Sequence, residues 1–107
     1  MINWGRVKEL KQEVGEEDFG EVVEMFMEEV DEVLTPMRRG ENDPLTLESD
    51  LHFLKGCALN IGFDGFSDLC HDGEKRAATG QGGSVSITRV IEVFDRSKDA
   101  FLSGLRE

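Results

Sequence analysis

The sequence is poor in cysteine and in long apolar runs. Its two cysteines, Cys57 and Cys70, are too few for a disulfide framework and form no paired metal-binding motif, so we interpret both as free thiols. No apolar run approaches the roughly 20 residues of a membrane span, and the opening "MINWGRVKEL" lacks the basic and apolar regions of a signal peptide. We therefore expect a cytoplasmic protein that makes no membrane contact.

Basic residues are also scarce. The chain has 12 Lys and Arg against 23 Asp and Glu, which gives a formal net charge of -11 at pH 7. Such a charge repels nucleic-acid phosphates and anionic lipid surfaces, so a folded protein or a small ligand is the expected partner. The 107 residues suit one domain, residues 1–107, and are too few for a nucleotide-binding domain beside a substrate domain. We expect a monomer.

Apolar residues recur at helical spacing in every long segment, and no segment shows the alternation typical of a strand. The pattern predicts a short first helix that ends near Gly15 and a second that begins at residues 16–18 and ends at residues 38–40. Pro36 should kink or end this second helix near Leu34–Thr35. The expected apolar residues are Trp4, Val7, Leu10 and Val14 in the first helix, and Phe19, Val22, Val23, Phe26, Val30, Val33, Leu34 and Met37 in the second.

Three further helices follow. Asp43 and Pro44 predict an N-cap and first position for a helix over about 44–62, a fourth covers about 65–79, and the flexible "TGQGGS" leads to a fifth. Four amphipathic helices with short connections predict an all-α, antiparallel four-helix bundle with a short additional N-terminal helix. The expected core residues are Leu47, Leu51, Leu54, Ala58 and Ile61 in the third helix, Phe66, Leu69, Cys70 and Ala77 in the fourth, and Ile87, Val90, Ile91, Phe94, Phe101, Leu102 and Leu105 in the fifth.

His52 is the candidate functional residue. At about 100° per residue it lies roughly 140° from the apolar stripe of the third helix and should face solvent. Glu48, Lys55, Gly56 and Leu59 are three, four or seven positions from His52 and should share its face. Lys55 suits a phosphoryl group or a carboxylate, and Leu59 supplies an apolar contact. The combination indicates a docking surface around the imidazole.

Each of these residues alone has an ordinary interpretation. A single exposed histidine, lysine or leucine needs no function. A glycine inside a helix costs about 1 kcal/mol of stability relative to alanine. Two explanations could account for Gly56 at this position. It either keeps the imidazole accessible or allows close packing of helices, and the residue pattern leaves both open.

The segment "HFLKGCALNIGF", His52 to Phe63, resembles the phosphorylation segment of histidine-containing phosphotransfer (HPt) domains, which is close to H-x-L-K-G-[SA]-[SA]-x-x-[LIV]-G. The matching residues are His52, Leu54, Lys55, Gly56, Ala58, Ile61 and Gly62. The following "FSDLCHDGEKRAATG" is similar to the next helix of the family, including Leu69, Cys70, Glu74 and Ala77. Two positions depart from the family pattern: Cys57 replaces a serine or alanine, and Gly73 stands where a core leucine is expected, which would weaken local packing.

The resemblance implies a phosphoryl carrier that is not an enzyme and has no cofactor of its own. His52 would accept a phosphoryl group from the aspartate of a response-regulator receiver domain and pass it to another receiver, with Lys55 and Gly56 assisting and Glu48 and Leu59 contacting the partner. The receiver would supply Mg²⁺, and a hybrid histidine kinase is a second implied partner. Elementary chemistry agrees, because an exposed neutral imidazole is a nucleophile without an adjacent base. Its more protruding nitrogen, Nε2, is the expected acceptor.

Other functions are weaker interpretations. The glycine cluster "GQGG" at 80–83 lacks a Walker lysine and serine and follows no strand, so it predicts no ATP site. A metal site built from Cys57, Asp68, Cys70 and His71 lacks a dense ligand motif, and we expect no metal and an ordinary surface role for His71. The main alternative is a helical module that binds a receiver or kinase without accepting phosphate.

Overall fold

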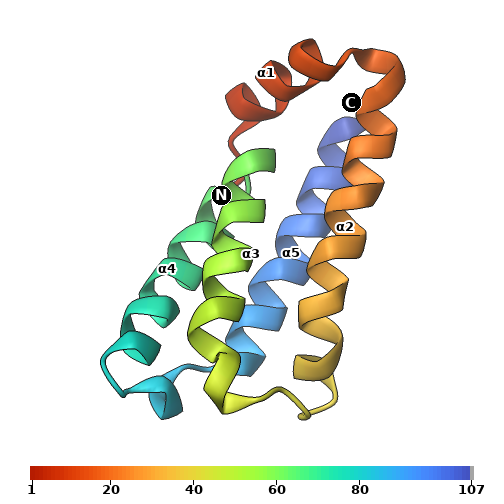
Figure 1. Ribbon diagram of the computed structural model, residues 1–107. Helices are drawn as coiled ribbons and strands as arrows, with labels where there is room; N and C mark the ends of the chain where they lie inside the picture. Colours follow the sequence, from red (N-terminus) through yellow and green to blue (C-terminus); the bar gives the residue numbers. More distant parts are fainter. Residues whose placement is uncertain (107) are drawn as a thin grey trace.

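The computed structural model describes residues 1–106, which form five α-helices and two short 3₁₀ turns (Figure 1). An isolated bridge between Ile2 and Phe63 is the one strand-like pairing within these residues. The prediction of an all-α chain with a short N-terminal helix is confirmed. The elements are α1 (Trp4–Val14), α2 (Glu16–Arg38), η1 (Pro44–Thr46), α3 (Leu47–Ile61), α4 (Asp64–Ala78), η2 (Gly82–Ser84) and α5 (Ile87–Leu105).

Helices α2 to α5 run side by side in alternating directions, and α1 crosses one end of this bundle (Figure 1). The bundle is elongated, with extents of 42 × 23 × 20 Å. Val7 and Leu10 of α1 are buried, so α1 covers the end of the core as a lid. None of the helices in residues 1–106 is both long and apolar enough to cross a membrane.

A cluster of phenylalanines forms the centre of the core. Phe63, in the turn between α3 and α4, is fully buried, and its ring lies 5.1 Å from Phe26 of α2 and 5.3 Å from Phe101 of α5. Phe94 of α5 lies 5.3 Å from Phe66 of α4 and 6.0 Å from Phe63. The cluster therefore joins α2, α4 and α5. The helical stripes did not predict Phe63, because it lies just outside a helix.

The expected core of α3 is confirmed, since all five residues predicted for it are at most 5% exposed. Two expectations for other helices are wrong. Trp4 is 42% exposed, although it stacks on Phe101 at 6.0 Å, and Leu105 is 37% exposed because it lies in the last turn of α5. Half-buried rather than buried are Val14, Val22, Val33, Leu69, Ala77, Ile87, Ile91 and Leu102.

Pro36 does not end α2, which continues to Arg38. Pro36 has no N–H to donate to the carbonyl group of Glu32, so α2 lacks one internal hydrogen bond there and then continues for two more residues. Here the N–H of Arg39 donates to the carbonyl groups of Thr35 and Pro36, and Met37 is 3% exposed. Packing of Met37 against the core therefore holds the last turn in place.

The start of the third helix also differs from the prediction. Asp43 is an N-cap as expected, and its carboxylate accepts a hydrogen bond of 2.9 Å from the N–H of Leu45. The first turn is the 3₁₀ turn η1, however, and α3 begins at Leu47. Leu45 consequently points outward and is 92% exposed.

Two glycines fit places where a side chain would collide. Gly62 ends α3 with φ of 90°, and a Cβ there would lie 2.7 Å from the carbonyl oxygen of Asn3. Gly73 of α4 is buried, and its Cβ would lie 3.0 Å from Leu51 and 3.4 Å from Val85. Leu51 and Val85 thus occupy the space that a leucine at position 73 would need.

Candidate functional site

His52 lies in the first half of α3 and projects from the bundle, with 70% of its side chain exposed. This confirms the orientation predicted from the helical phase. Glu48, Gly56 and Leu59 are also exposed on α3, with Leu59 at 54%. Lys55 differs, because its side chain is only 20% exposed and turns toward α4.

Glu74 of α4 joins the two basic side chains of α3. Its Oε2 atom lies 2.6 Å from Nδ1 of His52, and its Oε1 atom lies 2.6 Å from Nζ of Lys55. The Glu74 side chain is 14% exposed, so its two oxygens are held between the helices. Sequence reasoning included Glu74 only as a match to a family pattern and did not predict this contact.

The charges fix the state of this site. The hydrogen bond from Lys55 lowers the pKa of Glu74 most strongly, His52 lowers it further, and partial burial opposes both. Glu74 is therefore an ionised carboxylate at neutral pH and can only accept hydrogen bonds. Neutral His52 must carry its proton on Nδ1 to donate to Glu74, which leaves the lone pair on Nε2.

His71 borders the site. Its Nδ1 atom lies 3.4 Å from Nζ of Lys55 and 3.9 Å from Oε1 of Glu74, while 56% of its side chain is exposed. The expectation that His71 is an ordinary surface residue did not include this contact. The distances from His71 to Lys55 and Glu74 are longer than the 2.6 Å between Lys55 and Glu74, so His71 lies at the edge of the site.

The four residues of the conceivable metal site do not assemble. Within residues 1–106, no three His, Cys, Asp or Glu side chains are grouped closely enough to hold a metal ion. Burial raises the pKa of the Cys70 thiol to about 12. Burial and the nearby carboxylate of Glu29 raise the pKa of Cys57, whose Sγ lies 4.0 Å from Glu29.

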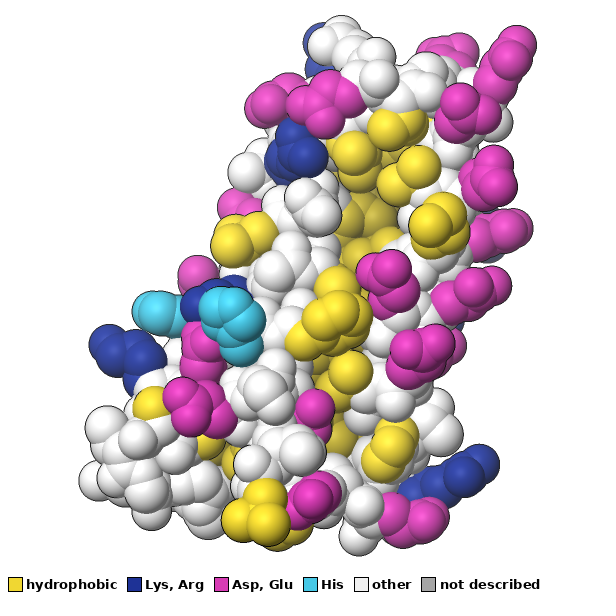
Figure 2. Space-filling view, in the orientation of Figure 1, with side chains coloured by type: hydrophobic (Ala, Val, Ile, Leu, Met, Phe, Trp, Pro, Cys, Tyr) yellow, Lys and Arg dark blue, Asp and Glu magenta, His cyan; other side chains and the backbone are white. Residues whose placement is uncertain are grey.

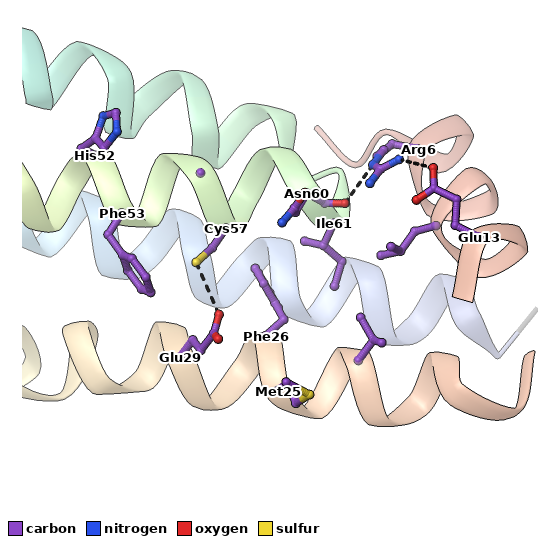
Figure 3. A pocket seen from close by; sticks show the side chains of 13 residues that line it. Arg6, Glu13, Met25, Phe26, Glu29, His52, Phe53, Cys57, Asn60 and Ile61 are labelled. Atoms are coloured by element: carbon purple, nitrogen blue, oxygen red, sulfur yellow. Dashed lines mark hydrogen bonds and ion pairs between the residues drawn. The ribbon is translucent and has the colours of Figure 1, made fainter. Parts of the chain in front are cut away.

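Two depressions flank His52. The larger, which we name the α2–α3 groove, has a volume of about 670 Å³ and extends from His52 to α1 (Figure 3). Its lining includes two large exposed apolar residues, Met25 at 54% and Phe53 at 42%. The smaller depression, of about 320 Å³, is lined by Leu45, Glu48, Ser49, His52 and Glu74.

Sequence reasoning missed the apolar residues Leu45, Met25 and Phe53, which line the two depressions that flank His52. Phe53 could have been found, because the helical phase that placed Leu59 outward also places Phe53 away from the core stripe. Met25 reaches the site from another helix, and Leu45 depends on the 3₁₀ turn. Neither had a sequence signal connecting it to His52.

The structure decides between the two explanations for Gly56. A Cβ at this position would meet no atom within 4 Å outside its own helix and chain neighbours. Close packing of helices therefore does not require glycine here. Gly56 lines the α2–α3 groove beside His52, so its missing side chain leaves space for an incoming group.

Comparison with known families agrees with this arrangement. The family model described as "Hpt domain" matches residues 21–100. The chain belongs to the Hpt domain family. Hpt domains have a phosphotransfer role in phosphorelays, interact with receiver domains of two-component systems and are generally not enzymes. The match starts within α2, so α1 lies outside the matched part of this Hpt protein. Searches of curated proteins and of solved structures gave no match.

Proposed function

We propose that His52 accepts a phosphoryl group on Nε2 from the aspartyl phosphate of a response-regulator receiver and passes it to the aspartate of another receiver. The contact of 2.6 Å between Nδ1 of His52 and Glu74 carries this proposal. It orients an imidazole that is otherwise 70% exposed and directs the lone pair to the nitrogen that faces away from Glu74.

In the proposed transfer, the Nε2 lone pair attacks phosphorus while the bond from phosphorus to the aspartate oxygen breaks. The aspartate leaves as a carboxylate, and the imidazole becomes positively charged because Nδ1 keeps its proton. The ionised Glu74 stabilises this charge through the existing hydrogen bond. Transfer back to a second receiver reverses these steps.

The remaining site residues have supporting roles in the proposal. Lys55, held by Glu74, adds positive charge near the phosphoryl oxygens, and Gly56 leaves room for the partner's aspartate. Glu48 and Leu59 contact the partner at the rim. The receiver supplies Mg²⁺ and the acidic pocket, so this chain needs no cofactor or ATP site. A hybrid histidine kinase that carries its own receiver is an equally suitable donor, and the reducing cytoplasm suits the two free thiols.

Transfer from chemically phosphorylated receiver domains tests the proposal. We expect acid-labile phosphate on the wild-type chain and none on His52→Gln, with helical content unchanged and receiver binding within a few-fold. His71→Gln is the matched control and should accept phosphate at nearly the wild-type rate. A chain that binds a phosphorylated receiver but never gains phosphate would instead be an interaction module, and equal loss in both variants would overturn the assignment to His52.

A further inference from the structure

The α2–α3 groove has walls of unequal charge. The α3 wall carries no acidic residue, and at the α1 end Arg6 and Glu13 form an ion pair of 3.2 Å. The α2 wall presents a carboxylate, Glu29, beside the apolar lining. The apolar side chains of the groove are Leu10, Val22, Met25, Phe26, Phe53 and Ile61.

The acidic side chains of α2 continue along this wall. Glu32 lies seven residues after Met25 and Glu29 four residues after it, so all three lie within about 60° of one another around the helix. Glu29 and Glu32 are exposed, and within residues 1–106 neither forms an ion pair. Figure 2 shows the apolar hollow and the acidic side chains beside it along α2.

We propose that this acidic wall selects the receiver: the groove takes one amphipathic helix of the partner, oriented with its basic residues toward Glu29 and Glu32. This inference rests on the proposed function. The α3 residues that line the groove, from His52 to Ile61, span about 14 Å, which matches between two and three turns of a helix. A partner helix with apolar side chains at positions i, i+3, i+4 and i+7 would fill such a groove. Lys or Arg residues on one flank of that helix would then pair with Glu29 and Glu32 of α2.

The charge of the chain argues against other occupants. A second copy would bring another chain of net charge -11 and place acidic walls together. A receiver helix with acidic flanks would be repelled in the same way, whereas a helix with basic flanks is attracted from a distance and is held in one orientation. The acidic wall thus favours receivers whose docking helix has basic flanks over receivers whose helix has acidic flanks, even when both transfer phosphate from an aspartate in the same way.

Cys57 provides a reporter inside the groove. Its thiol is half-buried among the lining residues, and the second thiol, Cys70, is fully buried with its pKa raised to about 12. A small alkylating reagent should therefore modify Cys57 alone. A partner helix in the groove would shield Cys57 without any need for phosphate transfer.

The experiment uses the full chain carrying His52→Gln and a panel of unphosphorylated receiver domains, so that binding is measured without transfer. A saturating receiver with a basic, apolar helix should slow alkylation of Cys57 by about tenfold or more. Glu29→Gln with Glu32→Gln should weaken binding about tenfold at low salt and reduce its salt dependence. The matched pair Glu17→Gln with Glu24→Gln, on the side of α2 away from the groove, should change affinity less than about twofold.

Several results would overturn the inference. Cys57 that stays fully reactive under a saturating receiver would place docking elsewhere, and equal weakening by the two glutamate pairs would indicate only a net-charge effect. Protection of Cys57 by raising the concentration of the chain alone would assign the groove to a second copy. Receivers that give phosphate to wild-type His52 yet leave Cys57 exposed would refute this inference only. Receivers that protect Cys57 but never transfer phosphate would refute the proposed function only.

Discussion

At the scale of single residues, Glu74 determines what His52 can do. One carboxylate oxygen accepts from the imidazole and the other from Lys55, each at 2.6 Å. Neutral His52 therefore has one favoured tautomer although most of its ring is in solvent. Without Glu74, His52 would be an exposed histidine like many others.

Replacing Glu74 by glutamine should slow phosphate acceptance by roughly tenfold or more, because the amide neither stabilises the charged imidazole nor fixes its tautomer. Single-turnover transfer from a phosphorylated receiver measures this. Asp72→Asn is a suitable control, since Asp72 lies on the same helix and pairs with Arg76 at 2.9 Å instead. Equal rates for wild type and Glu74→Gln would show that Glu74 has no role in transfer.

The contacts of Glu74 with Lys55 and His52 also predict that the stability of the protein depends on pH. Because the pKa of Glu74 is lower in the folded protein, its ionisation stabilises the fold above the unfolded-state pKa, and this contribution is lost as pH falls through the folded value. The unfolding free energy of wild type should therefore fall relative to that of Glu74→Gln between about pH 5 and about pH 3. Urea unfolding at both pH values measures the difference, and a constant difference would contradict the prediction.

Gly56 leads to opposite effects on stability and on transfer. Since a Cβ meets no other atom there, Gly56→Ala should stabilise the isolated chain by up to about 1 kcal/mol through helix propensity. Gly56→Gln should fold as well but slow transfer strongly, because its side chain would occupy the space beside His52. Thermal melting and transfer rates together test this, and normal transfer by Gly56→Gln would remove the access argument.

At the scale of secondary-structure elements, α3 presents three faces with different environments. Its apolar stripe is buried, Lys55 contacts α4, and His52, Gly56 and Leu59 face solvent. The spacing of apolar residues predicted the first and third faces. It could not predict the contact with Glu74, which requires that α3 and α4 pack with one particular register.

Element ends were the less predictable part. Pro36 indicated an early end of α2, but the packing of Met37 outweighs its local effect. The 3₁₀ turn η1 replaces the first turn of the expected third helix and exposes Leu45. In both places tertiary contacts or small differences between helix types decide, and neither is encoded in apolar spacing.

The exposed face of α3 gives a binding prediction. Leu59→Asp should weaken receiver binding by about 1–3 kcal/mol, since a buried apolar contact is lost and a charge is placed in the interface. The isolated chain should lose little stability, because Leu59 is 54% exposed. Calorimetric titration and thermal melting measure the two effects. Unchanged affinity would remove Leu59 from the interface, and a large drop in melting temperature would assign it to the core.

At the scale of the whole molecule, the phenylalanine cluster around Phe63 holds the bundle together. Phe63 contacts α2 and α5 from the turn that joins α3 to α4, the two helices that carry His52 and Glu74. The fold class followed from apolar spacing along the whole chain. The cluster did not, because Phe63 belongs to no helical stripe.

Phe63→Ala should reduce the unfolding free energy by about 3–5 kcal/mol, the cost of a large cavity in a core. Phe53→Ala is the matched control, since Phe53 is 42% exposed in the groove and should cost far less stability. Urea unfolding of both variants measures the contrast. Similar losses in the two would mean that the core is not centred on Phe63.

The most direct test of the central proposal is to locate the phosphate after transfer. Nuclear magnetic resonance of the ¹⁵N-labelled chain, phosphorylated by a receiver, can assign the modified nitrogen from its coupling to phosphorus. We predict phosphate on Nε2 of His52, with Nδ1 still protonated and bonded to Glu74. Phosphate on Nδ1 of His52, on His71 or on a carboxylate would contradict the proposal.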